Sequence, residues 1–516
     1  MQTPAAAIAW EFRQRHRWGF AALALYLLAL GVIRLIAVRS GRVAFHDAET
    51  FALAVIVPLT AIFIYFLAIF SFGLSGDLAA RQSIFPTRMF TLPVTSSALA
   101  GWPMLYGSLA VMAVWFATRF LGVWPAGSDV PIAWPALLAA SLLCWTQALT
   151  WMTYPLPGLR VAITVLWLAT IDAIVLIALD LKASEAVMLA ILLPHVPLAF
   201  LVARSAVARA RRGEVPDWRV RVDSRSSARN FRTAASALTW FEWRQHGRAL
   251  PMLVAIVLPF ELSLLFVFRE VPVIVNETIA MVLCTPPFMA MFVAASVSSG
   301  LTTFTTTRPL TDGGLIAAKL KATIASTLVT WWIVLAALAL TSRAALTDLA
   351  HQLAAIVGVP RAIAVGVVLI AMPMLVTWKQ LVQSLFIGMS GRTWLPKASV
   401  FAALAFLAIA VPLAHWAITT DAALRFLWNA LPWIIAALVI VKTAAAMWIG
   451  TRLPARQLVA TAIVYNVAVF TLYALLVWIF PELIVRHYLL AFLAIVAVPL
   501  VRVSAAPLAL SRSRHA

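Results

Sequence analysis

Long apolar runs follow one another along the whole chain, separated by short polar segments. A membrane-spanning helix needs about 20 consecutive, mainly apolar residues. About fourteen runs reach this length, at about 18–38, 51–73, 101–123, 131–153, 158–180, 186–204, 249–268, 277–299, 322–342, 362–388, 396–418, 424–448, 457–480 and 484–503. The pattern predicts an all-α polytopic membrane protein with about fourteen transmembrane helices.

Composition supports the same class. The 516 residues are 63% hydrophobic and only 11% charged, whereas a soluble domain is about 45–50% apolar and about 25% charged. The longest polar stretch, 204–248, is too short for a separate soluble domain. Cys144 and Cys284 both lie in apolar runs, so no disulfide framework is expected. The histidines show no metal-ligand spacing, so we expect no metal site.

The net charge of +20 helps to predict how the chain is oriented in the membrane. Such a charge would suggest nucleic acid in a soluble protein, but cytoplasmic loops of membrane proteins are rich in arginine and lysine. With the N-terminus inside, the predicted spans place most of the 39 basic residues on the cytoplasmic side. We therefore expect both termini in the cytoplasm and membrane lipids, not nucleic acid, as partners of the basic residues. The N-terminus lacks a short apolar core followed by a small-residue cleavage site, so we expect no cleaved signal peptide. The excess of arginine over lysine, with abundant alanine, suggests a bacterial inner membrane.

Three short phrases occur twice, in the same order. Glutamate-aromatic-arginine-glutamine stands at 11–14 and 242–245, Thr-x-Pro-x-Thr at 91–95 and 307–311, and Trp-x-Gln at 145–147 and 378–380. Ordered recurrence predicts an internal duplication. Each half has six predicted spans, an even number, so the halves form a parallel repeat about an axis along the membrane normal.

The duplication divides the chain into four parts. These are a first six-helix half at 1–205, a basic linker at 206–237, a second half at 238–455, and two additional helices with a short basic tail at 456–516. The linker is rich in serine and arginine and is typical of a flexible cytoplasmic segment. It could serve as a tether on anionic lipid or as a docking segment.

The element before the first span of each half combines aromatic and charged residues. Glu11 and Arg13 in the first copy correspond to Glu242 and Arg244 in the second. This pattern predicts an amphipathic helix at the cytoplasmic membrane interface. A generic aromatic belt would explain one copy, and the recurrence favours a dedicated elbow helix.

The loop between the second and third spans is the second repeated element. It covers 76–101 in the first half and 300–321 in the second. Proline fixes an extended bend there, and the following threonine can cap the next helix. The candidate residues are Asp77, Arg81, Arg88, Pro93, Thr95, Arg308, Pro309, Thr311 and Asp312.

These features resemble the permease subunits of type-2 ATP-binding-cassette transporters, which have six spans, an elbow helix before the first and a coupling helix between the second and third. Leu92-Pro93-Val94-Thr95 is similar to the phrase that ends this family's coupling region, and Arg308-Pro309-Leu310-Thr311 is a weaker match. The resemblance covers about residues 8–455 and implies two tandem permease halves. It implies that the loops above contact a cytosolic ATPase, expected as a homodimer, and that the chain is not itself an enzyme.

No phosphate-binding Gly-x-x-x-x-Gly-Lys-Ser/Thr loop occurs in the sequence. ATP and Mg²⁺ would therefore bind the partner ATPase, with no cofactor on this chain. The resemblance implies a permease, expected to act as an exporter of an unidentified substrate.

Polar side chains inside the apolar runs form a further set of candidates. Charges in a membrane are costly, and they usually pair or line a path. The candidates for a substrate path or intramembrane pairs are Arg34, Asp172, Glu261, Lys379, Gln147 and Gln380. Glu261 or Asp172 could pair with Lys379 or Arg34. His195, between two prolines, could titrate near neutral pH or simply pack beside a proline kink.

Two other classes of function stay open at this stage. An ion-coupled secondary transporter or lipid-linked flippase would also fit fourteen spans and parallel repeats. An integral membrane transferase acting on a lipid-linked substrate would fit the acidic first outer loop, where Asp47 and Glu49 lie.

Overall fold

The structure is a computed structural model that describes part of the chain. The described residues are 3–39, 55, 57–72, 77–122, 131–216, 231, 233–267, 272–296, 312–389, 421–450, 455–479 and 487–497.

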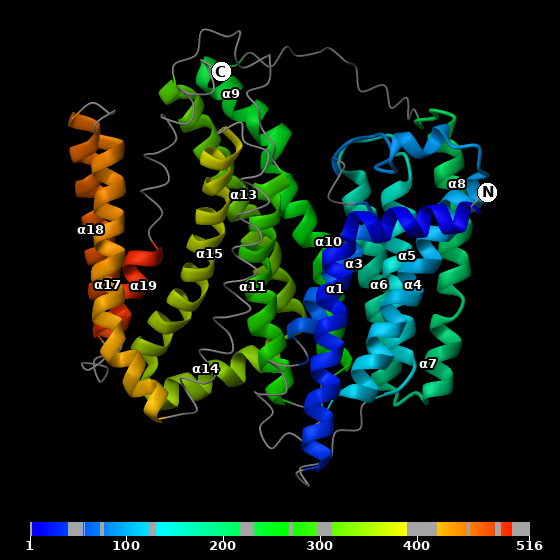
Figure 1. The fold of residues 1–516 in the computed structure, drawn as a ribbon, viewed down its shortest axis with the longest axis horizontal. Helices are drawn as coiled ribbons and strands as arrows, with labels where there is room; N and C mark the ends of the chain where they lie inside the picture. The colour runs from blue at the N-terminus through cyan, green and yellow to red at the C-terminus, as the bar shows by residue number, and fades with distance from the viewer. Residues whose placement is uncertain are drawn as a thin grey trace. The chain divides into compact units, whose positions relative to one another are not determined.

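All regular secondary structure in these ranges is helical (Figure 1). In chain order the helices are α1 (Pro4–Arg39), α3 (Val57–Phe70), η2 (Thr87–Thr91), α4 (Ser96–Leu121), α5 (Trp134–Trp151), α6 (Leu159–Asp180), α7 (Glu185–Leu192), α8 (His195–Arg211), α9 (Ala234–Glu242), η3 (Trp243–Gly247), α10 (Ala249–Val267), α11 (Pro272–Ser296), α13 (Asp312–Thr341), α14 (Arg343–Val357), α15 (Val359–Met389), α17 (Asp421–Gly450), α18 (Ala455–Ile479) and α19 (His487–Ala497).

Many of these helices are suited to a bilayer. Within the described residues, seven helices are long and apolar enough to cross a membrane, and a bent pair inside α1 would make an eighth. Three further helices are apolar but shorter, at Pro58–Phe70, Thr278–Met291 and Arg425–Val441. The all-α, multi-span class follows from these helices. The count of fourteen and the internal repeat stay predictions, and the span expected at 396–418 lies outside the described residues.

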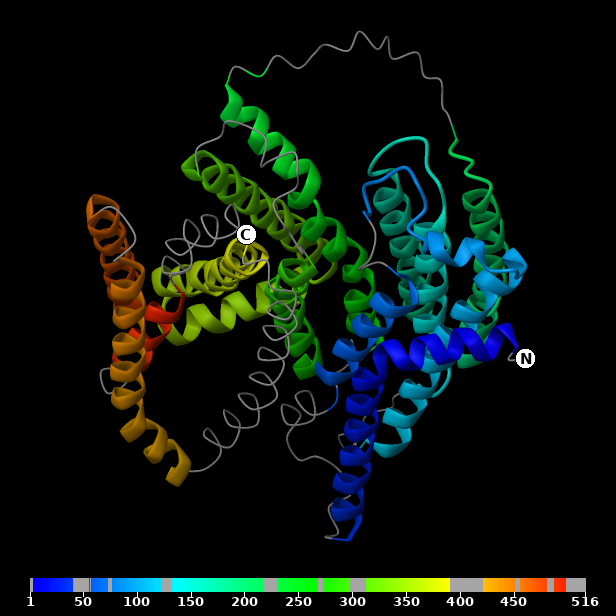
Figure 2. The same cartoon turned by 45° about the horizontal axis from the view of Figure 1, so that its top comes forward.

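The N-terminal helix α1 consists of two segments. The backbone leaves helical geometry at His16 (φ −117°, ψ 21°), and the segments Pro4–Gln14 and Gly19–Leu35 are bent by 79°. Figures 1 and 2 show the first segment turned away from the second. A separate helix therefore precedes the first span, at the position expected for an elbow.

The corresponding element of the second half is built differently. Ala234–Val267 forms one long candidate span, in which the π-helical turn η3 joins α9 to α10. Gly247 allows this geometry, because a Cβ there would lie 2.6 Å from the Trp243 ring. The second glutamate-aromatic-arginine-glutamine phrase thus continues into its span, whereas the first lies on a bent helix.

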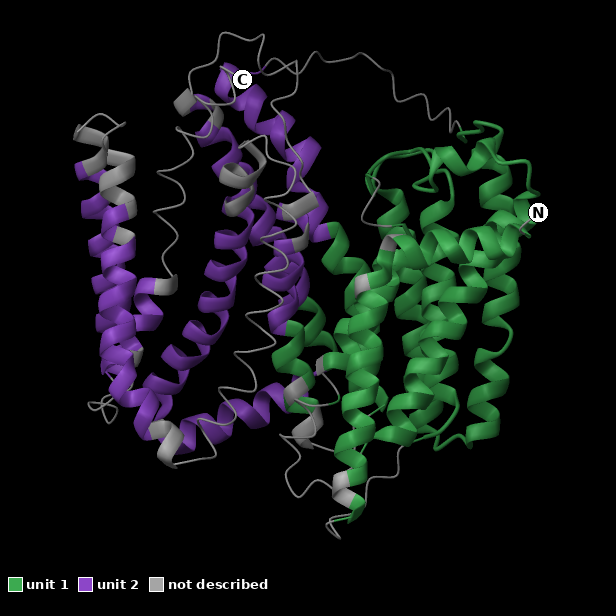
Figure 3. Ribbon diagram, in the orientation of Figure 1, with its two compact units in different colours: residues 1–228, 252–282, 336–341 green, residues 229–251, 283–335, 342–516 purple. Residues whose placement is uncertain are grey.

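The chain forms two compact units, coloured separately in Figure 3. The first contains residues 1–228, 252–282 and 336–341, and the second contains 229–251, 283–335 and 342–516. The first boundary lies within the linker predicted at 206–237.

Helix α5 is the centre of the first unit. It contacts α3, α4, α6, α7 and α8, and nearly all its residues are buried. A helix that is apolar on all sides is stable in such a position because each face meets another helix. Gly107 of α4 permits a close approach, since a Cβ there would meet Leu143 Cδ2 at 3.0 Å.

Hydrogen bonds between connecting segments define two ends of the first unit. At one end, the segment after α5 meets the segment after α3, through Tyr154 N to Arg81 O (3.0 Å) and Gly158 N to Ala79 O (3.1 Å). At the other end, Glu185 of α7 accepts hydrogen bonds from the amides of Ile132 (3.2 Å) and Ala133 (2.7 Å) before α5. We call the end where the segments after α3 and α5 meet the loop end.

The second unit contains an element that the span pattern did not predict. Helix α14 separates α13 from α15, and α13 begins at Asp312, about ten residues before the predicted span at 322–342. Trp331 of α13 is buried and donates to Thr377 Oγ1 of α15 at 3.1 Å. Helix α19 contacts α15, α17 and α18.

Candidate functional site at the loop end of the first unit

The loop between α3 and α4 holds five of the predicted site residues: Asp77, Arg81, Arg88, Pro93 and Thr95. We call residues 77–95 the clamped loop. Its first turn is closed by the Asp77 side chain, whose Oδ1 accepts from the Ala79 amide at 2.9 Å, a local turn typical of aspartate. Its middle forms the short helix η2, at the position expected for a coupling helix.

A buried arginine of α6 holds the start of the clamped loop. Arg160 is fully buried. Its Nη1 donates to Asp77 O (3.1 Å) and Leu78 O (3.4 Å), and its Nη2 donates to Gln82 O and to Met152 O (3.4 Å). A buried guanidinium is stabilised where its donors find acceptors; here both terminal nitrogens bond to main-chain carbonyls, while Nε has no partner among the described residues. The loop backbone is thereby fixed to α6.

Sequence reasoning assigned Arg160 only to the basic cytoplasmic side. The sequence offered one signal nearby, a proline-rich turn that ends at Gly158, just before α6. In the structure Gly158 has φ 82°. Tyr154 lies in the same turn and donates to Leu149 O at 3.0 Å. Burial raises the pKa of Tyr154 to about 12, so the phenol stays a hydrogen-bond donor at neutral pH.

Aromatic side chains form the floor beneath the clamped loop. The Phe85 ring meets Trp151 edge-on at 5.1 Å and Phe72 at 5.6 Å. Trp151 Nε1 donates to Ser71 O at 3.1 Å, and Ser83 Oγ donates to Trp151 O at 2.5 Å. Edge-to-face pairs of this kind add about 0.5–1.5 kcal/mol beyond area burial. The floor joins α5 to the end of α3 and to the middle of the loop.

The first segment of α1 is attached to this floor and to η2. Phe12 is buried and lies 5.1 Å from the Phe70 ring. Glu11 forms an ion pair with Arg88 of η2. Tyr106 of α4 donates to Ala5 O at 2.9 Å. The two predicted elements, elbow and loop, are therefore in contact, although 77 residues separate Glu11 from Arg88.

The end of the clamped loop is attached to α8. Arg211 Nη1 donates to Val94 O (2.6 Å) and its Nη2 to Leu92 O (3.1 Å). Pro93 lies between these two carbonyls and holds the backbone extended. Thr95 then caps α4, accepting from Ala98 N at 3.3 Å, as its sequence predicted. The Leu92-Pro93-Val94-Thr95 phrase thus connects α8 to the start of α4.

The clamped loop also meets the start of the linker. Arg81 Nη2 donates to Pro216 O at 3.2 Å. Arg212 and Glu214 form an exposed ion pair of 2.6 Å, and the hydrogen bond from Arg212 lowers the pKa of that carboxyl. Exposed side chains at this end include Arg13, Arg88, Arg209, Arg211 and Arg212. Their excess over acidic residues favours contact with an acidic surface.

The candidate residues inside the apolar runs differ in burial and in hydrogen bonding. Asp172 is buried in α6, and its Oδ1 has no hydrogen-bond partner among the described residues. Arg34 is exposed on α1, so the suggested pair with Asp172 is not formed. Glu261 is fully buried on α10. Lys379 and Gln380 lie half-buried on α15.

Gln147 is bonded to two neighbouring helices of the first unit. It is fully buried, and its Nε2 donates to Phe70 O (3.0 Å) and Pro103 O (3.4 Å), while its Oε1 has no hydrogen-bond partner among the described residues. The carbonyl of Phe70 is an orphan acceptor at the end of α3. The Trp-x-Gln phrase of α5 therefore bonds to three other helices, α3, α4 and α8, the last through Trp145, which donates to His195 Nδ1 at 3.1 Å. His195 is accordingly a packed residue beside its prolines.

The second copy of the site is described only in part. Arg308, Pro309 and Thr311 lie outside the described residues, and Asp312 opens α13. Glu242 is buried and lies 3.3 Å from His246 Nδ1. The Arg244 guanidinium lies 4.9 Å from the centroid of the Trp240 ring. Across the described residues, no group of three histidine, cysteine or acidic side chains could hold a metal.

Comparisons with protein-family models, curated proteins and solved structures give no match. The composition and the apolar helices define the class, an all-α polytopic membrane protein. A narrower functional class has to be argued from the residues and contacts of the loop end.

Proposed function

We propose that this chain is the transmembrane subunit of an ATP-driven transporter with two tandem permease halves, in which the clamped loop receives force from a cytosolic ATPase. The observation that carries the proposal is the set of attachments of the loop. Arg160 joins it to α6, Arg211 joins it to α8, and Arg88 joins it to the first segment of α1.

These attachments supply a physical route for coupling. The loop also leads directly into α4 through the Thr95 cap. A displacement of η2 would therefore act on four helices together, because each is bonded to a different part of the loop. Contiguous hydrogen bonds and rigid helices can carry such coupling. A loop that only connected two spans would not need a buried arginine on four carbonyls.

In this mechanism the chain performs no covalent chemistry. The partner would bind ATP and Mg²⁺ and press on η2, whose Arg88 side chain is 52% exposed. The second loop, with Arg308 and Thr311, would receive the other subunit of a homodimeric ATPase. Fourteen spans, a parallel repeat, cytoplasmic termini, a bacterial inner membrane and export are parts of this proposal.

The test is association with candidate ATPase subunits of this transporter class, co-expressed with the full chain and co-purified in detergent. We expect one to be retained. Arg88→Glu in η2 should lower retention at least tenfold, whereas Lys182→Glu, an exposed substitution at the opposite end, should leave it unchanged. Equal retention by both variants would contradict a docking role for the loop end.

Transport by the reconstituted chain separates the other classes. ATP-dependent transport that needs the co-purified subunit supports the proposal. Transport driven by an ion gradient without ATP would identify a secondary transporter or flippase. A covalent product from a lipid-linked substrate, abolished by Asp47→Asn, would identify a transferase.

A further inference from the structure

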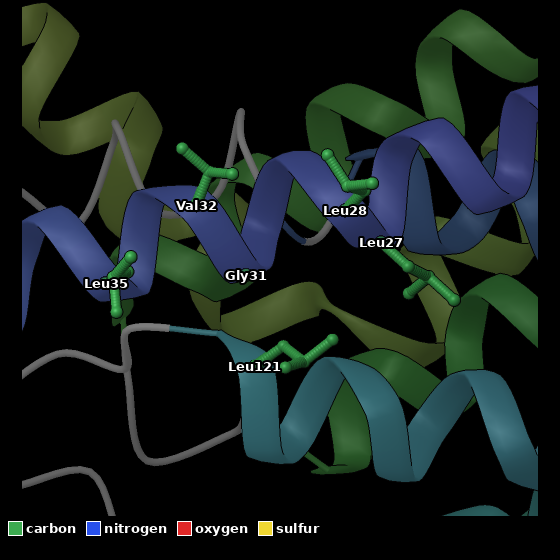
Figure 4. A pocket seen from close by; sticks show the side chains of 6 residues that line it. All are labelled: Leu27, Leu28, Gly31, Val32, Leu35 and Leu121. Atoms are coloured by element: carbon green, nitrogen blue, oxygen red, sulfur yellow. The ribbon is translucent and has the colours of Figure 1, made fainter.

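Helix α1 forms an apolar groove with the end of α4. The groove has a volume of about 510 Å³ and is lined by Leu27, Leu28, Gly31, Val32, Leu35 and Leu121 (Figure 4). Leu28 and Leu35 remain 64% and 55% exposed. Gly31 leaves the groove open, since a Cβ there would meet only Leu121 Cδ2, at 3.9 Å.

Two arginines lie beside this groove. Arg34 follows Gly31 by three residues and Arg39 follows Leu35 by four, spacings that place side chains side by side on a helix. Both arginines are exposed. Neither has a hydrogen bond or ion pair with another residue in the described part of the chain. Charge on a lipid-facing helix is costly unless a partner meets it.

The dimensions agree with one lipid leaflet. Eleven residues of helix separate Leu28 from Arg39, a rise of about 16 Å. Half of a typical hydrocarbon core is about 15 Å. An acyl chain lying along Leu28, Val32 and Leu35 would therefore bring its head group to Arg39 at the end of α1.

We propose that this groove is a binding site for a phospholipid with an anionic head group. The acyl chain lies between α1 and α4, and the phosphate and its anionic substituent meet Arg34 and Arg39. A purely apolar occupant, such as a helix from a second copy, would cover the groove but supply no counter-charge to either arginine, and the described residues supply none. The site belongs to the leaflet at the C-terminal end of α1, opposite the loop end.

The experiment uses the full chain, delipidated in detergent and titrated with phosphatidylglycerol or phosphatidylcholine, with bound lipid counted by native mass spectrometry. We expect tighter binding of phosphatidylglycerol. Because each basic residue near an anionic surface contributes about 1 kcal/mol, Arg34→Gln with Arg39→Gln should weaken phosphatidylglycerol binding roughly 30-fold. It should leave phosphatidylcholine binding unchanged. The matched control is Arg343→Gln with Arg361→Gln, exposed arginines of α14 and α15.

A second pair of variants tests the groove itself. Gly31→Leu fills it without changing charge and should lower binding of both lipids at least tenfold, whereas Gly31→Ala should have little effect. Thermal unfolding of each variant reports whether the fold is intact. Equal binding of the two lipids, or unchanged phosphatidylglycerol binding in the arginine variant, would overturn the site. A change in oligomeric mass with Gly31→Leu would assign the groove to a second copy instead.

Discussion

The guanidinium of Arg160, in the first turn of α6, donates to the main-chain carbonyl of Asp77 at 3.1 Å. This bond joins residues that are 83 positions apart. It connects the start of the fifth predicted span to the loop between the second and third, so the geometry of that loop depends on a side chain from another helix.

Removing the Arg160 side chain should release the clamped loop. Arg160→Met removes the donors to four carbonyls, of which only the bond to Leu78 O is fully buried, and a buried carbonyl left without a donor costs about 1–3 kcal/mol. We expect a total loss of about 3 kcal/mol in the free energy of opening the loop. The measurement is the rate of tryptic cleavage after Arg81 and Arg88 in the detergent-solubilised protein.

Arg209→Met is the control for this change, because Arg209 is exposed on α8 and surface substitutions usually change stability by less than about 0.5 kcal/mol. Equal cleavage rates for the two variants would mean that Arg160 does not hold the loop.

The ion pair between Glu11 and Arg88 should matter more for coupling than for stability. Exposed pairs contribute about 0.2–1 kcal/mol, so Glu11→Gln should hardly change thermal unfolding. Under the proposed function it should reduce the transport-linked ATPase rate, since it disconnects α1 from η2. Glu11→Asp, which keeps the negative charge and leaves Arg88 in place, should retain more of that rate. If Glu11→Asp loses as much of the rate as Glu11→Gln, the pair has no coupling role.

Thr95 should contribute a measurable helix cap. Its hydroxyl accepts from Ala98 N, and removal of such a cap costs about 1 kcal/mol. Thr95→Ala should therefore lower the free energy of unfolding of α4 by about that amount, measured by hydrogen exchange of its first-turn amides. Ser96→Ala, at the next position, removes a hydroxyl that makes no bond to a described residue. Similar effects from both variants would argue against the cap.

Gln147 should behave as a packing residue and not as part of a substrate path. Gln147→Leu keeps the volume but removes the donors to Phe70 O and Pro103 O. We expect a loss of about 2 kcal/mol in unfolding free energy, measured by denaturant titration in detergent, with unchanged substrate selectivity. Altered selectivity at wild-type stability would instead place Gln147 on the substrate path.

The two ends of the first unit should face opposite sides of the membrane. In a chain with Cys144→Ser and Cys284→Ser, a new cysteine at Thr87 should react with a membrane-impermeant maleimide only from the cytoplasmic side. A cysteine at Ser184, the exposed cap before α7, should react only from the other side. Labelling of both from one side would contradict the predicted topology.

Much of the helical framework follows from local pattern. Runs of about 20 apolar residues locate α4, α5 and α6 to within a few residues, because a helix in a membrane must satisfy its own backbone hydrogen bonds. The Thr95 cap and the separate helix before the first span were also predictable, since each depends on neighbours in sequence. Helix α14 was missed because it is less apolar and is not a span.

By itself the sequence determined the helical membrane class, the net charge of +20 and the residues to examine, including Glu11, Arg88 and Gln147. Only the tertiary structure decided how they are used. It buried Arg160 on the loop carbonyls, paired Glu11 with Arg88, and bonded Gln147 to the carbonyls of Phe70 and Pro103. It also left Arg34 exposed beside a groove. The reason is physical: hydropathy is a property of consecutive residues, whereas a hydrogen bond between residues 83 positions apart exists only after the helices have packed.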